Sequence, residues 1–381
     1  MIFSNARLIL PDGIRDGLEV VVAAGKIAEI RKRSNAEAID LGGSYLAPGF
    51  IDLHVHGAVG RDAMEASPEA FHVICDYHAS GGTTALVLTT ATAPIPDILH
   101  VLLAVRTCRD ELKQIAGVHV EGPFISRKSA GAQRTEFIMN PEPQLVQQLL
   151  EYADVIERVT LAPELPGALE AIDLLRAQNI AVSGGHSDAW DEEARNAFEH
   201  GMRQVTHTFN CMSSMHRREG ERVAGLLEFA LSEPEMMCEL IADGHHVPNT
   251  LMKMLYRAKG AAGICLVTDA TAGAGLPEGA RFTLAGADCM VSGGACWLAD
   301  RSALAGGSAR MIDLVRTMVR QVGVPLAEAI AMASANPSRA LGLSTKGRLE
   351  AGADADFVVL SEDLEVVQTF VAGERIYAKS C

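Results

Sequence analysis

Two histidines separated by one residue, His54 and His56, end an apolar run that is typical of a buried strand. Because alternate residues of a strand point to the same side, their imidazoles can bind one metal ion together. Four more groups suited to metal binding or acid–base chemistry follow, each where a predicted strand ends: Glu121, His186, His207 and Asp269. Imidazole and carboxylate donors favour zinc, iron, manganese or cobalt, as one or two ions. A divalent ion lowers the pKa of bound water and polarises a carbonyl, so we expect hydrolysis with Asp269 as the acid–base.

Each of these groups also has a structural explanation when it is taken alone. Most histidines on strands are hydrogen-bonded structural residues, and Glu121 could be an ordinary loop carboxylate. His186 could cap the following helix, and Asp269 could be a helix N-cap. The metal site is favoured because all of these groups recur at strand ends, which meet at one rim if the strands form a barrel.

The part of the chain from residue 50 to 343 alternates buried strands with amphipathic helical segments. The predicted strands are Ile51–His56, Thr84–Thr89, Gly117–Glu121, Arg158–Ala162, Ile180–Ser183, Gln204–Thr208, Met237–Ala242 and Ile264–Thr268. Helices are predicted over Pro68–Ser80, Ile98–Leu112, Gly167–Gln178, Asp191–His200, Ala309–Val322 and Leu326–Leu341, with a hairpin-like insertion over Thr271–Leu298. Eight strand–helix units predict an α/β fold, a closed parallel (β/α)8 barrel of the TIM type. A doubly wound open sheet is the alternative, but its first turn would offer glycines to a cofactor, not histidines.

Both ends of the chain have short apolar runs separated by turn signals, and Pro48-Gly49 marks the boundary with the middle part. Residues 2–47 predict a small antiparallel sheet, and strands are also expected within residues 356–377. Either set alone is too small to hold a core. We therefore expect one small accessory β-sandwich domain formed by residues 1–48 and 344–381, beside a metal-dependent barrel over residues 49–343.

Composition limits the partners of this protein. Its 381 residues have a formal net charge of −15, which argues against nucleic acids and anionic membranes. No membrane-length apolar run and no N-terminal export pattern are present, which predicts a cytoplasmic protein. Eight cysteines without a C-x-x-C pair predict neither a disulfide framework nor a cysteine zinc site. An anionic small-molecule substrate would need a local cluster of positive groups.

Motifs along almost the whole chain resemble the N-acetylglucosamine-6-phosphate deacetylase family of the amidohydrolase superfamily. They occur in the family's order and lie within Pro48–Gly57, His119–Phe124, Ser183–Ser187, Thr206–Asn210, Ile241–His246, Val267–Thr271, Leu304–Ser308, Ala335–Leu343 and Gly347–Asp356. The resemblance implies that Glu121, His186 and His207 are the core metal ligands and that Asp269 is the catalytic acid–base. Family members with His-x-His can hold a second ion, so His54 and His56 favour two ions.

The same resemblance implies the contacts with an amino sugar phosphate. Asn210, the backbone at Cys211, Arg218 and His246 would contact the phosphate end, with Arg218 serving the neighbouring subunit of a homodimer. Such a cluster would explain how an acidic protein binds an anion. Taken alone, Arg218 and His246 could instead be ordinary loop residues. Further substrate contacts are expected from residues of two loops: Ala132, Gln133, Leu304, Ala305 and Gly306.

The substrate half of the predicted site departs from the family pattern. Gln133 stands where the family usually has a histidine, and Cys211 where it commonly has alanine. Glutamine can donate and accept hydrogen bonds but cannot carry the positive charge of an imidazolium. The expected reaction is removal of the N-acetyl group from an amino sugar 6-phosphate, with N-acetylglucosamine-6-phosphate or its galactosamine epimer as substrate.

Two other functions are weaker alternatives. Cyclic-amide hydrolases usually bridge two ions with a carboxylated lysine near the end of strand four, but that strand ends Leu161-Ala-Pro-Glu164, without lysine. A barrel that binds sugar phosphate without catalysis would be expected to lose Asp269 or the ligands, and all of them are present.

Overall fold

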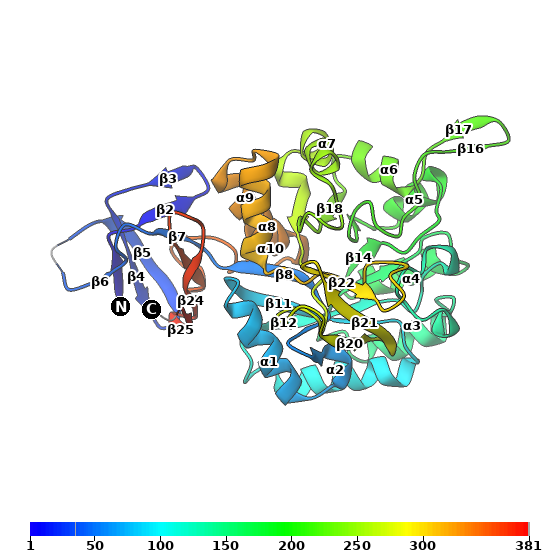
Figure 1. The fold of residues 1–381 in the computed structure, drawn as a ribbon, viewed down its shortest axis with the longest axis horizontal. Helices are drawn as coiled ribbons and strands as arrows, with labels where there is room; N and C mark the ends of the chain where they lie inside the picture. Colours follow the sequence, from blue (N-terminus) through cyan, green and yellow to red (C-terminus); the bar gives the residue numbers. More distant parts are fainter. Residues whose placement is uncertain (35, 380–381) are drawn as a thin grey trace.

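The computed structural model describes residues 1–34 and 36–379. It contains an eight-stranded parallel barrel surrounded by helices, and separate sheets formed by strands from both ends of the chain (Figure 1). This confirms the predicted (β/α)8 barrel with an accessory β-domain. None of the helices formed by the described residues combines the length and the apolar character that crossing a bilayer requires.

The barrel strands pair in the order of the sequence. They are β8 (Phe50–Val55), β11 (Thr83–Thr90), β12 (Ile115–Glu121), β13 (Ile156–Leu161), β14 (Ala181–Gly184), β15 (Gln204–Val205), β18 (Met237–Leu240) and β19 (Ile264–Leu266). The segment after β19 closes the barrel against β8, where the backbone N–H of Asp269 donates to the carbonyl of His54 at 3.0 Å. Asp52 strengthens this junction because its carboxylate accepts from the hydroxyl of Thr268 at 2.6 Å. All eight predicted strands are therefore present, within a few residues of their expected bounds.

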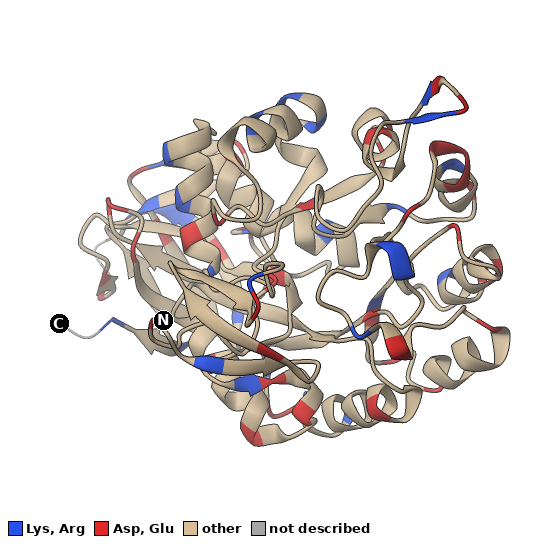
Figure 2. Cartoon of the chain, turned by 45° about the vertical axis from the view of Figure 1, so that its right-hand side comes forward, with Lys and Arg blue, Asp and Glu red and all other residues tan. Residues whose placement is uncertain are grey.

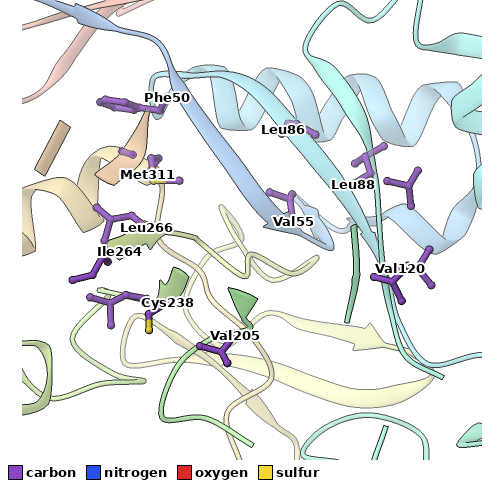
Figure 3. Close-up of a cluster of buried hydrophobic side chains, with 14 of the residues drawn as sticks. Phe50, Val55, Leu86, Leu88, Val120, Val205, Cys238, Ile264, Leu266 and Met311 are labelled. Carbon is purple, nitrogen blue, oxygen red and sulfur yellow. The ribbon is translucent and has the colours of Figure 1, made fainter. Parts of the chain in front are cut away.

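Apolar side chains fill the layer between the barrel and the helices. Figure 3 shows part of this cluster, where Phe50 and Leu266 of the barrel strands lie near Met311 of α8 (Met311–Thr317). The alternate residues of several strands are polar and face one another inside the barrel. His119 lies between the hydroxyls of Thr89 and Thr160, at 3.3 and 2.7 Å. One side of each strand thus builds the core, and the other side is available for a site.

The helices follow the strands, with corrections at several ends. They are α1 (Pro68–Ala79), α2 (Ile95–Cys108), α3 (Pro143–Leu150), α4 (Ala168–Ala177), α5 (Asp191–Glu199), α6 (Leu226–Ser232), α7 (Asn249–Lys259), α8, α9 (Leu326–Ala333) and α10 (Ala335–Leu341). The predicted helix Ile98–Leu112 was misplaced by three residues at its start, because Pro96 is tolerated in a first turn.

Two of the predicted C-terminal helices are also wrong in detail. Residues 326–341 form two helices, because the ring of Pro337 cannot coexist with a helical carbonyl at Ala333, and the backbone breaks at Ser334 (φ −137°, ψ −75°). The predicted helix Ala309–Val322 begins at Met311 and ends in a π-helical turn over Met318–Val322.

The accessory part has two sheets instead of the single antiparallel sheet expected from residues 2–47. Strands β5 (Lys26–Lys32), β4 (Leu18–Ala23), β1 (Ile2–Ser4) and β6 (Ile39–Asp40) form one sheet. The other has β25 (Glu374–Ala378), β24 (Val366–Val371), β23 (Phe357–Leu360), β7 (Tyr45–Pro48), β2 (Arg7–Leu10) and β3 (Gly13–Arg15). Both contain one parallel pair, β1 with β6 and β2 with β7.

The two ends of the chain share one core in this accessory part. Phe3 packs against Phe357 and Phe370 with ring centroids 4.9 and 5.2 Å apart. The exact domain bounds, 1–48 with 344–381 and 49–343, stay a prediction, and residues 35, 380 and 381 lie outside the described residues.

Small antiparallel sheets extend the loops of the barrel. Strands β20 (Arg281–Leu284), β21 (Ala287–Ser292) and β22 (Ala295–Leu298) form a three-stranded sheet where a hairpin-like insertion was predicted. Strands β16 (His216–Arg218) and β17 (Glu221–Val223) form a hairpin that projects from the body at the upper right of Figure 1. A short pair, β9 (Gly57–Ala58) and β10 (Arg61–Asp62), follows the first barrel strand.

Arg158 and Glu239 form an ion pair inside the barrel, with side chains 0% and 1% exposed. Replacing Arg158 by methionine should lower the free energy of unfolding by about 3–5 kcal/mol, because the Glu239 carboxylate would stay buried without a counter-charge. Denaturant unfolding measures the change. Arg195→Met is the control, since the ion pair of Arg195 with Asp191 is exposed and long, at 4.0 Å. The double variant Arg158→Met/Glu239→Gln should be more stable than Arg158→Met, and an equal or larger loss would contradict this explanation.

Candidate metal centre and active site

The six groups predicted to bind metal or move protons all lie at the carboxyl end of the barrel. His54 lies in β8 and Glu121 ends β12, and the others follow the ends of β8, β14, β15 and β19: His56, His186, His207 and Asp269. All six are buried, with at most 8% of any residue exposed. The structure therefore brings together residues from five separate segments, as predicted.

The six side chains form two groups that can each hold a cation. In the first group, Oε1 of Glu121 lies 3.3 Å from Nε2 of His186 and 3.2 Å from Nε2 of His207. The second group consists of His54, His56 and Asp269, whose Oδ1 lies 3.3 and 3.4 Å from the two Nε2 atoms. Glu121 also reaches the second group, since its Oε2 lies 3.2 Å from Nε2 of His56.

The donor atoms of both groups converge in a way that fits divalent ions. Within each group two imidazole Nε2 atoms are only 3.1 Å apart, so their lone pairs need a proton or a cation between them. Nδ1 of His186 faces the carbonyl of Ser129 at 2.9 Å, which makes Nδ1 the protonated nitrogen and leaves Nε2 free to bind metal. Nδ1 of His54 similarly faces Oε2 of Glu239 at 3.5 Å. The chain thus has two candidate groups for divalent metal.

The two carboxylates of the centre are held in their charged form. Burial alone would raise the pKa of Asp269, but the charges and hydrogen bonding of His54 and His56 outweigh it and lower that pKa to about 2. The pKa of Glu121 is likewise held well below its usual range, against burial, by His54, His186 and His207. Both side chains are therefore anionic at neutral pH, as ligands or as a general base must be.

The backbone is strained where it presents three of these groups. His186, His207 and Asp269 have φ values of 46°, 33° and 49°, in the left-handed region that residues with a Cβ rarely adopt. Each such residue costs about 1–3 kcal/mol, and such strain gathers at functional sites. Neighbouring Gly185 is also required, because a Cβ there would lie 2.8 Å from Cβ of Thr206.

A cavity of about 300 Å³ opens beside the two groups and takes in most of the predicted substrate residues. Those that line it are Ala132, Gln133, Asn210, Cys211, His246, Leu304 and Gly306. Ala305 does not line it: the residue is buried, and its carbonyl accepts from the hydroxyl of Thr271 at 3.1 Å. Arg218 lies on the projecting β16–β17 hairpin, where it pairs with Glu192 at 2.8 Å. The roles of these residues stay predictions.

A carboxylate that the sequence analysis did not single out fixes the ring of His246. Oδ2 of Asp243 lies 2.7 Å from Nδ1 of His246, and its Oδ1 accepts from the backbone N–H of His246 at 2.9 Å. Burial alone would lower the pKa of His246, but the hydrogen bond and charge of Asp243 outweigh it, so the pKa is raised above the ordinary value. His246 can therefore present a positive charge to an anion in the cavity.

Other contributing residues were also missed, although some gave a signal. Glu239 and Asp52 are each the single acidic residue of their predicted strand. Asp52 alternates with His54 and His56 along its strand, so the three side chains should point to the same side. Phe209, Thr271, Ala303 and Leu284 line the cavity and carry no comparable signal. His119 could have supported a metal ligand, but both of its ring nitrogens face threonine hydroxyls. It is a buried, hydrogen-bonded residue that packs edge-on against His54, with ring centroids 4.6 Å apart.

Comparison with known proteins agrees with this geometry. Residues 45–376 match the amidohydrolase family. The chain is 34% identical to N-acetylglucosamine-6-phosphate deacetylase of Lysinibacillus sphaericus, over 98% of this chain and 97% of the relative. It is 35% identical to N-acetylgalactosamine-6-phosphate deacetylase of Escherichia coli O157:H7, over 97% of both proteins.

Solved structures give the same result. N-acetylglucosamine-6-phosphate deacetylase from Pasteurella multocida superposes with a TM-score of 0.93 and 31% identity, over 99% of both chains. A mutant of the enzyme from Mycobacterium smegmatis, in complex with N-acetyl-D-glucosamine-6-phosphate, has the same TM-score at 30% identity and covers 99% of both chains. The chain therefore belongs to the amidohydrolase family and is an enzyme that hydrolyses carbon–nitrogen bonds of amides. Within that family it groups with the N-acetylglucosamine-6-phosphate deacetylases, which confirms the resemblance noted in the sequence.

Asp243 should control the charge of His246. Replacing Asp243 by asparagine removes the anion but not the burial, so the pKa of His246 should fall below the ordinary histidine value of about 6.5. An NMR titration of the histidine ring signals measures this. In the control, Asp173→Asn removes the carboxylate from an exposed pair with His200 and should leave His246 unchanged. An unaltered His246 pKa in Asp243→Asn would show that another group holds its proton.

Proposed function

We propose that this enzyme removes the N-acetyl group of an amino sugar 6-phosphate and releases acetate and the amino sugar phosphate. N-acetylglucosamine-6-phosphate is the first candidate substrate. The observation that carries the proposal is the meeting of the two candidate metal groups, one of which contains Asp269, at one wall of a cavity of about 300 Å³. The galactosamine epimer is the second candidate, because the Escherichia coli relative named for it is as similar as those named for the glucosamine substrate.

The proposed cofactor is a pair of divalent ions, with zinc before iron, manganese or cobalt. Glu121, His186 and His207 would hold one ion, and His54, His56 and Asp269 the other. Bound metal would supply Lewis acidity towards the acetyl carbonyl and make water acidic enough to act as a nucleophile.

Asp269 moves the proton in the proposed reaction. Water oxygen bonds to the acetyl carbonyl carbon, the bond from that carbon to nitrogen breaks, and the carboxylate of Asp269 carries a proton from the water to the leaving nitrogen. The low pKa of Asp269, about 2, keeps its carboxylate unprotonated at neutral pH.

The phosphate would be bound at the other end of the cavity. Asn210, the backbone at Cys211, and His246 are the candidates within the same chain, and His246 has the raised pKa that suits an anion. We propose that the enzyme is a homodimer in which Arg218 serves the neighbouring site. Support comes from the position of the β16–β17 hairpin, which projects from the body (Figure 1) and carries basic and acidic residues (Figure 2). A cytoplasmic location stays a prediction.

Asp269→Asn should lower kcat by about 100- to 10,000-fold, because the variant cannot take up the proton of water. Substrate binding, measured by calorimetry with N-acetylglucosamine-6-phosphate, should remain. Metal content is determined in the same samples, so that loss of an ion is distinguished from loss of the base. Asp300→Asn, in an exposed turn of the insertion, is the control. Turnover near the wild-type rate with full metal content would contradict the role of Asp269.

The rate of turnover should depend on the phosphate group of the substrate. An amine-release assay compares both epimeric N-acetylamino sugar 6-phosphates with the unphosphorylated sugars, at defined metal loading. Arg218→Met should raise KM about tenfold or more for phosphorylated sugars only, since a hydrogen bond between charged groups is worth about 1.5–3 kcal/mol. Arg195→Met, an exposed arginine on α5, is the matched control. Equal rates with and without phosphate would defeat the roles given to Arg218 and His246.

A mixing experiment tests whether Arg218 acts across a dimer. Subunits with Arg218→Met are combined with subunits carrying Asp269→Asn. If Arg218 serves the neighbouring site, the mixed dimer contains one site with both residues intact and activity returns. If Arg218 acts within its own chain, no site has both residues and activity stays low.

A further inference from the structure

The carboxamide of Gln133 lies between a metal-binding carboxylate and the backbone of a neighbouring loop. Gln133 belongs to the loop that follows β12, directly before the short helical turn Thr135–Phe137. Its Oε1 accepts from the backbone N–H of Thr92 at 2.7 Å, and its Nε2 donates to Oε2 of Glu121 at 2.8 Å. Both ends of the carboxamide are therefore engaged in the wall of the cavity.

These partners allow only one orientation of the carboxamide. The backbone nitrogen of Thr92 can only donate, so it must face the oxygen of Gln133. The NH2 group must then face Oε2 of Glu121, which lies 2.8 Å away. Gln133 thus gives Glu121 a neutral hydrogen-bond donor that leaves the negative charge of the carboxylate in place.

The frame around this bond is rigid. The backbone N–H of Gln133 donates to the carbonyl of Ala130 at 3.0 Å, in a turn whose Gly131 has a φ of 58°. On the other side, Thr92 is packed so closely against Gly122 that a Cβ there would lie 2.2 Å from the threonine hydroxyl oxygen. The backbone at Gln133 and at Thr92 therefore cannot shift without disturbing these contacts.

The hydrogen bond fixes where Oε2 of Glu121 lies. A carboxylate without this bond can turn about its last torsion and offer both oxygens to one ion. With Gln133 in place, Oε2 is held beside His56, at 3.2 Å, and Oε1 lies beside His186 and His207 and 3.4 Å from Nε2 of His54. The first group has its own support, because the carbonyl of Ser129 fixes His186 independently of Gln133.

We propose that Gln133 is a positioning residue that holds Glu121 as a bridge between the two candidate metal groups. It supports binding of the ion at His54, His56 and Asp269 more than binding of the ion at His186 and His207. This inference rests on the proposed metal-dependent function and concerns how many ions the centre retains.

Metal binding without turnover tests the inference. Zn²⁺ is titrated calorimetrically into chelator-treated wild-type protein and into Gln133→Met, which has a similar length but cannot donate a hydrogen bond to Glu121. The wild type should bind two ions. In Gln133→Met the tighter ion should change less than about threefold, while the second should weaken about 10- to 100-fold, the range for removal of a group that supports a ligand. Gln133→Glu, which sets a second carboxylate against Glu121, should show the same selective loss.

Controls separate a positioning role from general damage. Lys128→Met changes an exposed side chain of the same loop, which pairs with Asp188, and should leave both constants unaltered. Equal weakening of both ions in Gln133→Met, or an unchanged second ion, would overturn the inference. A wild-type protein that binds only one ion would also overturn it and leave the deacetylase proposal standing. A wild-type protein that binds no divalent ion would remove the proposed function as well.

Discussion

One carboxylate, that of Glu121, lies beside both candidate groups of metal ligands, and the carboxyl end of the barrel is arranged around it. Its two oxygens lie within 3.4 Å of four imidazole nitrogens that arrive from three different strand ends. A buried anion needs such compensation, because a carboxylate removed from water without it costs several kcal/mol. The parallel barrel is suited to this task, since it brings the ends of distant strands to a single rim.

Glu239 and Arg158 form a second set of buried charges next to the candidate metal centre, and Glu239 holds two of its histidines in place. Glu239 accepts from the backbone N–H of His207 at 3.1 Å and faces Nδ1 of His54, and its own charge is offset by Arg158. Burial lowers the pKa of Arg158 only to about 10, so the guanidinium stays positive at neutral pH. The net charge of −15 therefore says little about the site, where local pairs decide which charges an incoming group meets.

Much of the fold and of the metal centre was predictable from local patterns. The eight strands were found from apolar runs, and the ligands from their place at strand ends, because a strand's alternation fixes which side chains share a face. The partners of those ligands were not predictable. Glu239 and Arg158 lie on strands far apart in the sequence, and which interior positions meet depends on the register of the whole barrel.

The backbone conformation of the site residues was also not predictable from the sequence. The residue types at His186, His207 and Asp269 do not predict a left-handed backbone, because glycine or asparagine is the usual residue in that conformation. The orientation of the Gln133 carboxamide was not predictable either, because its partners Thr92 and Glu121 come from other segments of the chain. The expected contact of Gln133 with the sugar stays a prediction. Such features follow from tertiary packing, which overrides the preference of a single residue.

The pairing of β7 with β23 has a consequence for how the chain is made. Pro48 of β7 lies opposite Phe357 of β23. Strand β7 can therefore form this pair only after β23, near the end of the chain, has been synthesised. Every barrel strand is produced between these two partners. All residues of the barrel rim are therefore synthesised while β7 still has an open edge, and only the last part of the chain covers that edge.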